Sequence, residues 1–138
     1  MEQNKIAIMI RIASVQFERH SQQYLAEYGL IFSQFAILKY LMLYEGTPIR
    51  QVDIEKFFMM TNPTVTGILN NLEKKDMIRR CPNPDDGRSK LIVMTEKARA
   101  FAPQLDVIRE KINESFIQGL TEEEKKQMRI LLRKIISK

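Results

Sequence analysis

The chain of 138 residues contains no tryptophan, one histidine and one cysteine. A lone cysteine, Cys81, excludes an internal disulfide and fits the reducing cytoplasm. One histidine and one cysteine cannot build a closed soft-ligand metal site, so we expect no metal and no cofactor. Each apolar run is too short to span a bilayer, so we expect no membrane partner.

We expect neither a secretory leader nor a catalytic constellation. Residues 1–5 lead directly into an amphipathic segment, without an apolar leader core or a small-residue cleavage site. No Ser-His-Asp set, paired-carboxylate cleft or phosphate-binding glycine loop is readable, which disfavours an enzyme. His20 and Cys81 fall in separate predicted elements, which disfavours a Cys-His pair.

The net charge of +5 is mild and unevenly distributed. Residues 1–45 are balanced, residues 46–95 carry 8 basic against 6 acidic side chains, and residues 96–138 carry 10 against 7. This excess permits contact with phosphate but does not prove it, so the order of motifs has to carry the functional argument.

Apolar residues spaced three and four apart predict a mainly α-helical chain. Helices are predicted over residues 5–28, 33–44, 51–58, from 61 or 62 onwards, 95–118 and 121–137. Gly29 is expected to end the first helix in the left-handed region, and Ser33 to cap the second. Either Thr61 or Asn62 caps the fourth helix, and Pro103 predicts a kink in the fifth.

The buried side of the fourth helix is predicted from a stripe of apolar residues, and a small β wing follows it. The stripe is Val65, Ile68, Leu69 and Leu72. Residues 77–81 and 90–94 are predicted strands, joined by a turn in which Gly87 permits positive φ and Asp86 closes the turn or orients Arg88. The order helix, turn, helix, hairpin is typical of a winged helix-turn-helix DNA reader, here residues 30–95.

The terminal helices, residues 1–29 and 96–138, are long and amphipathic. Packing them against one small winged domain leaves apolar stripes in water, whereas pairing with a second copy buries them. We therefore predict one domain over residues 1–138 that forms a homodimer through these helices. The alternative is a monomer whose end helices fold over its core.

Residues 62–80 resemble the recognition helix and first wing strand of the MarR (multiple antibiotic resistance regulator) family. Residues 86–97 resemble that family's wing signature, an Asp and an Arg two apart followed by an apolar strand ending in Thr. The resemblance covers nearly the whole chain. It implies a homodimer that binds a pseudo-palindromic operator, usually as a repressor. In the family, a small aromatic effector or cysteine oxidation often releases the DNA.

The chain departs from the family pattern at three positions. Gly67 stands where an exposed Arg is common, and Gly87 replaces a common basic residue of the wing. Met59 stands where the turn between the two helices often has Gly. Because Met at positive φ is costly, the turn is expected to differ in detail.

Short hydrogen-bonding side chains on the recognition helix and basic side chains on the wing form the predicted DNA-binding set. It comprises Ser33, Thr61, Asn62, Thr64, Thr66, Asn70, Arg80, Arg88 and Lys90. Capping alone is the alternative for Ser33 and for Thr61 or Asn62, and a solvated, salt-bridged surface for the others. Arg79 flanks the wing and is nearly as well explained by solvation.

An aromatic face of the first helix, with Phe17, His20 and Tyr24, is the candidate effector cleft. The alternative for His20 is a satisfied interface histidine, which is the simpler interpretation. Cys81 follows two arginines but lies on a wing strand, so we take it as an ordinary strand residue rather than a redox switch. The rival function is a winged-helix protein-interaction module that binds DNA weakly.

Overall fold

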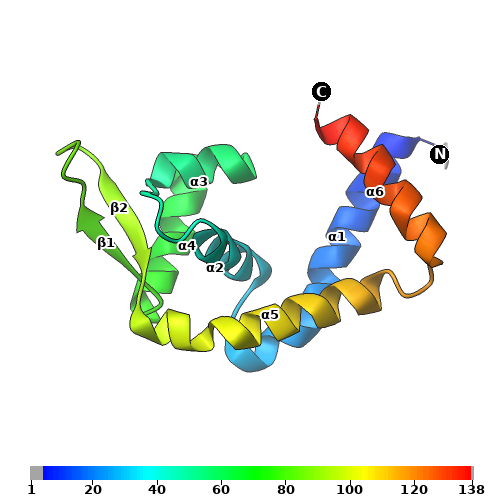
Figure 1. Cartoon of the computed structure of the whole chain (residues 1–138), viewed down its shortest axis with the longest axis horizontal. Coiled ribbons are helices and arrows are strands. Elements are labelled where there is room, and N and C mark those ends of the chain that lie inside the picture. Colours follow the sequence, from blue (N-terminus) through cyan, green and yellow to red (C-terminus); the bar gives the residue numbers. More distant parts are fainter. Residues whose placement is uncertain (1–4, 138) are drawn as a thin grey trace. The chain divides into compact units, whose positions relative to one another are not determined.

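The structure, a computed structural model that describes residues 5–137, confirms the predicted fold class, mainly α with a two-stranded wing (Figure 1). What was predicted for residues 1–4 lies outside the described residues. The elements are α1 (Ile6–Leu25), the 3-10 helix η1 (Ala26–Tyr28), α2 (Phe32–Leu43), α3 (Gln51–Phe58), α4 (Asn62–Lys74), β1 (Ile78–Pro82), β2 (Lys90–Met94), α5 (Glu96–Phe116) and α6 (Glu122–Ile136).

Residues 25–107 form one compact unit that holds the helix-turn-helix and the wing. In it α3 and α4 pack against each other, and α4 packs against α2 and β1. The fully buried side chains include Ile37, Leu38, Ile54 and Ile78. The predicted stripe of α4 is buried as a set, namely Val65, Ile68, Leu69 and Leu72. Hydrophobic burial by this unit's own residues therefore fixes α4.

The second unit combines residues up to Tyr24 with those from Ile108 onwards. Ile108 and Ile112 of α5 are buried, but all of α6 is described and none of its residues is buried. Large apolar side chains are instead exposed on α1 and α6. They include Ile6, Met9, Ile12, Met128, Ile130, Leu131 and Ile135. A single chain thus leaves apolar surface on its terminal helices, as the sequence pattern suggested.

The ends of the first two helices give one confirmed and one wrong prediction. Gly29 has φ 68° and ends the first helical segment in the left-handed region, as predicted. Ser33 does not cap α2. The N-cap is Ile31, whose N–H donates to Gln34 Oε1 at 3.3 Å, and Ser33 lies in the first turn. An amide three residues into the helix satisfies the free N–H, so a hydroxyl at the cap is not needed.

The turn between α3 and α4 places Met59 in the left-handed region, which is costly for a residue with a side chain. Met59 has φ 54° and ψ 44°, so the prediction that the turn would differ from the glycine-type geometry is wrong. The Met60 N–H donates to Glu55 O at 3.0 Å and closes the end of α3 around this left-handed residue. The Met59 side chain is 93% exposed, so only backbone geometry constrains the position.

The wing is an antiparallel hairpin in which Ile78 pairs with Met94 and Pro82 with Lys90. β1 begins one residue later than predicted, while β2 has the predicted bounds. The Ile92 N–H donates to Ile49 O at 2.8 Å, which joins the wing to the segment before α3.

The turn of the wing follows one of its two predicted rules. Asp86 Oδ1 accepts the Arg88 N–H at 2.9 Å, so Asp86 closes the turn as predicted. Positive φ occurs among the described residues at Gly29, Gly46, Met59 and Asp76, and not at Gly87. The prediction for Gly87 is therefore wrong, because the Asp86 side chain makes the turn with ordinary backbone angles.

Helix α5 stays continuous across Pro103 and ends at Phe116, two residues before the predicted end. A kink at Pro103 stays a prediction. Thr121 caps α6, since its hydroxyl accepts the Glu124 N–H at 3.1 Å while Glu124 Oε1 accepts the Thr121 N–H at 2.9 Å.

We predict that Met59→Gly stabilises the winged unit. Glycine adopts the left-handed region without the Cβ clash, so the free energy of unfolding should rise by about 1 kcal/mol. Urea unfolding followed by circular dichroism measures the change. The matched control is Met42→Gly inside α2, which should lower stability. A fall in stability for Met59→Gly would contradict the strain argument.

Candidate nucleic-acid interface

The N-terminus of α4 settles which residue caps the recognition helix. Thr61 is the N-cap: its hydroxyl accepts the Thr64 N–H at 3.4 Å and donates to Thr64 Oγ1 at 2.9 Å. Asn62 is the first helical residue, and Pro63 follows in the first turn, where its missing N–H is harmless. The free N–H groups and the helix dipole at this end favour a negatively charged partner.

The face of α4 opposite its buried stripe is polar and open to solvent. Its exposed residues include Asn62, Pro63, Thr64, Gly67, Asn70, Asn71 and Lys74. Amide and hydroxyl groups both donate and accept hydrogen bonds, which suits the edges of bases in a major groove. The structure therefore brings Asn62, Thr64 and Asn70 together on one accessible face.

Thr66 departs from this pattern, because it is half-buried and tied to α3. Gln51 Nε2 donates to Thr66 Oγ1 at 2.8 Å, and Asn62 Nδ2 donates to Glu55 Oε2 at 2.9 Å. Both bonds join α3 to the first two turns of α4. Thr66 therefore has a positioning contact inside the protein that the sequence did not indicate, and its contact with DNA stays a prediction.

Arg80 of β1 is bound to α4 rather than extended into solvent. Its guanidinium donates to Glu73 Oε1 at 2.9 Å and to Asn70 Oδ1 at 3.0 Å, and its side chain is 18% exposed. The Asn70 amide is thereby oriented, since its oxygen is the accepting atom and its NH₂ group stays available as a donor. Only the folded hairpin brings Arg80 beside Asn70, so no local sequence signal indicated this pair.

The basic residues nearer the wing tip are accessible. Arg88 and Lys90 are exposed, and the Arg88 backbone N–H is held by Asp86. Arg79, near the base of the hairpin, is exposed as well. Ser33 is half-buried on α2 within the same unit. The exposure of Arg88 and Lys90 suits contact with phosphates, which these charged side chains reach from the surface.

A capping box at the start of α3 was missed by the sequence analysis. Asp53 Oδ2 accepts the Arg50 backbone N–H at 2.8 Å, and Asp53 Oδ1 accepts from Arg50 Nη2 at 3.1 Å. Burial raises the pKa of Asp53, but the side-chain and backbone hydrogen bonds from Arg50 outweigh it and hold the pKa below its usual value. An acid three residues after a helix start was the available signal.

The predicted aromatic cluster of the other unit is assembled around Ser115. His20 Nε2 and the Tyr24 hydroxyl both hydrogen-bond Ser115 Oγ, the latter at 2.9 Å, and the rings of Phe17 and Phe116 lie 5.2 Å apart. An open hollow of about 550 Å³ beside it is lined by Tyr24, but not by Phe17 or His20. A role for the three as an effector cleft stays a prediction.

The described residues offer no cluster of three or more His, Cys, Asp or Glu side chains that is able to hold a metal ion. None of the described helices is both long and apolar enough for a membrane span. Cys81 is a half-buried residue of β1 opposite Leu91.

Gly67 generates a prediction about stability. A Cβ built at Gly67 meets no described atom within 4 Å, and its φ is not positive. Gly67→Ala should therefore raise the free energy of unfolding by about 0.5–1 kcal/mol, the helix-propensity difference. The matched control is Gly46→Ala, which should lower stability because φ there is +92°. Urea unfolding measures both, and destabilisation by Gly67→Ala would show a hidden steric demand.

Comparisons with known proteins agree with this architecture. The model of the MarR family matches residues 33–90. The HTH-type transcriptional regulator MgrA of Staphylococcus aureus is 26% identical over 117 residues, which cover 85% of this chain and 77% of MgrA. The S. aureus MepR–DNA complex superposes with a TM-score of 0.87 at 28% identity, covering 98% of both chains. A probable transcriptional regulator from Pseudomonas aeruginosa gives 0.86 at 25% identity, covering 98% of this chain and 99% of its own. In sequence and in fold the chain is similar to the MarR family of winged-helix transcriptional regulators.

Proposed function

We propose that the chain is a sequence-specific, double-stranded DNA-binding repressor that uses α4 in the major groove and the wing beside it. The observation that carries the proposal is the division of α4 into a buried apolar stripe and an exposed face of Thr and Asn side chains. The related S. aureus MepR, with a similar fold throughout, is known in complex with DNA. As a regulator it is assigned no catalytic activity, and we expect it in the cytoplasm.

Different residues serve different parts of the DNA in this proposal. Asn62, Thr64 and Asn70 read base edges or adjacent phosphates, while Thr61 and Ser33 present first-turn groups to the backbone. Arg88 and Lys90 neutralise phosphates or enter the minor groove beside the site. Arg80 and Thr66 act mainly by positioning Asn70 and α4, through the bonds described above.

The homodimer rests on the exposed apolar side chains of α1 and α6. A large apolar surface on a small chain is a candidate interface between copies, and symmetric pairing is the commonest way to bury it. Two copies related by a two-fold axis present two α4 helices, which matches a pseudo-palindromic operator. A small aromatic effector that releases the operator is proposed with it. The division of the chain remains a proposal, in which residues 30–95 bind DNA and residues 1–29 and 96–138 form the dimer.

The rival, a protein-interaction module with weak DNA contact, differs in its salt dependence. We expect the logarithm of affinity for operator DNA, selected from a genomic library, to fall linearly with the logarithm of salt concentration. Arg88→Ala and Lys90→Ala should each reduce that slope by about 0.9, because each removes one phosphate contact. Fluorescence anisotropy at several salt concentrations measures the slopes.

The control for this experiment is Arg99→Ala. Arg99 is also exposed, but it pairs with Glu45 and Glu96, and its variant should keep the wild-type slope. A flat dependence in the wild type, or equal affinity for selected and random fragments, would favour the interaction module.

Dimerisation is predicted to depend on α6 and not on exposed apolar residues in general. Leu131→Asp should shift the protein from dimer to monomer in sedimentation velocity at micromolar concentration, because a charge then faces the apolar interface. Leu43→Asp is the matched control: Leu43 is 74% exposed and Leu131 58%, but Leu43 lies in the winged unit. A dimer that survives Leu131→Asp, or is lost equally in both variants, would count against this interface.

A further inference from the structure

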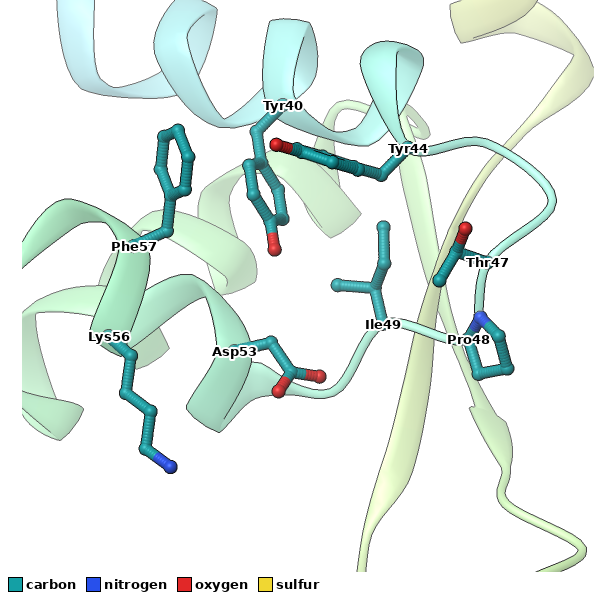
Figure 2. Close-up of a pocket in the computed structure, with 8 residues that line it drawn as sticks. All are labelled: Tyr40, Tyr44, Thr47, Pro48, Ile49, Asp53, Lys56 and Phe57. Carbon is teal, nitrogen blue, oxygen red and sulfur yellow. The ribbon is translucent and has the colours of Figure 1, made fainter.

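A pocket lies inside the winged unit, between the C-terminal half of α2, the segment after it and α3 (Figure 2). Its volume is about 490 Å³, which is within the range of small-molecule sites. Three aromatic rings form one wall: the ring centroids of Tyr40 and Phe57 are 4.7 Å apart, and those of Tyr40 and Tyr44 are 4.8 Å apart. Phe57 and Tyr44 are exposed, so their rings belong to an accessible surface and not to the buried core.

Among the side chains that line this pocket, the ionised Asp53 carboxylate accepts hydrogen bonds without donating any. Figure 2 shows the Asp53 carboxylate below the Tyr40 hydroxyl, while the Lys56 amine points away from the rings. Asp53 Oδ2 accepts two bonds from Arg50, at 2.8 and 3.4 Å, but Oδ1 accepts only one, at 3.1 Å. Since a carboxylate oxygen has two lone pairs, Oδ1 retains acceptor capacity.

The charge states of Asp53 and Tyr40 agree with an ionised acceptor beside a neutral phenol. The bonds from Arg50 keep Asp53 ionised, as described above. Burial, and then the negative charge of Asp53, raise the pKa of Tyr40, so its phenol stays protonated at neutral pH. The pocket therefore combines flat apolar walls with one ionised acceptor.

We propose that this pocket binds a flat aromatic ligand whose N–H group donates a hydrogen bond to Asp53 Oδ1. The ring of the ligand packs against Tyr44 and Phe57, where aromatic contacts add to the burial of apolar area. An amidinium or a primary amide supplies the N–H donor. A carboxylate of the same shape has no N–H donor and is repelled by the negative charge of Asp53.

The wall made by α3 connects the pocket to the recognition helix. Asp53 and Phe57 belong to α3. Two side-chain hydrogen bonds join the same helix to α4, one between Gln51 and Thr66 and one between Glu55 and Asn62. A ligand that shifts α3 alters these bonds and thereby the N-terminus of α4. This regulatory step rests on the proposed DNA-binding function, whereas binding to the pocket does not.

Three nearly isosteric probes test the binding step: benzamidine, benzamide and benzoate. Proton NMR titration of the full chain, without DNA, should give the order benzamidine, benzamide, benzoate from tightest to weakest, with shifts in the Tyr44 and Phe57 ring signals. Binding of benzoate as tight as benzamidine, or no shift with any probe, would overturn the proposal.

The matched variants are Tyr44→Leu and Tyr28→Leu, since both tyrosines are exposed to a similar extent, 39% and 38%. Tyr44→Leu should weaken benzamidine about fivefold through the lost ring contact, and Tyr28→Leu should leave it unchanged. Equal effects of the two variants would contradict the assigned site.

The regulatory step is measured separately, by operator affinity with and without saturating benzamidine. We expect a change in affinity in the wild type that is absent in Tyr44→Leu. If the protein binds no operator, the proposed function fails while the NMR result stands. If benzamidine binds but leaves operator affinity unchanged, coupling through α3 is refuted.

Discussion

Burial of one stripe of α4 is the constraint on which the other features of the winged unit depend. Val65, Leu69 and Leu72 have no exposed surface, so the rotation of α4 about its axis is fixed by packing. Because the helix period places residues three and four apart on one side, this rotation leaves the Thr and Asn side chains outward. The same helix thus supplies part of the core and the whole of the polar face. A substitution that disturbs the stripe changes stability and DNA contact together.

Polar residues around α4 are already bonded within the protein, which limits how they serve DNA. Asn70 accepts from Arg80 and keeps its NH₂ group for a partner, so orientation is gained without loss of the donor. Asn62 is different, because one of its two N–H donors bonds to Glu55, so a DNA contact through that N–H has to replace this bond. Replacing one satisfied hydrogen bond by another gives little net free energy. We therefore expect Asn70 to contribute more to base discrimination than Asn62.

Most features set by local chemistry were predicted from the sequence, and those that were missed have both local and long-range causes. Helix periodicity and the left-handed Gly29 depend on neighbours a few residues away and were predicted. The cap of α4 was narrowed to Thr61 or Asn62, of which the structure has Thr61. The prediction that Ser33 caps α2 was wrong because the Gln34 side chain accepts the Ile31 N–H and places the cap at Ile31. The prediction of positive φ at Gly87 was wrong because the Asp86 side chain closes the turn. Met59 takes positive φ despite its cost, since packing of α3 on α4 imposes the turn. The Arg80–Asn70 bond joins two elements, so no sequence window contains it.

The terminal helices differ from α4. Their apolar stripes are clear in the sequence, but a single chain leaves many of these side chains exposed. Helix α6 has 15 residues, and Leu131 and Ile135 remain exposed along it. Helices of this length are marginal alone in water, and the Thr121 capping box contributes only about 1 kcal/mol. The remaining stabilisation has to come from packing of its apolar face. In the proposed homodimer a second copy supplies that surface in a symmetric way, and the same step sets two recognition helices on one operator. Folding of α6, dimerisation and operator length are therefore expected to be coupled.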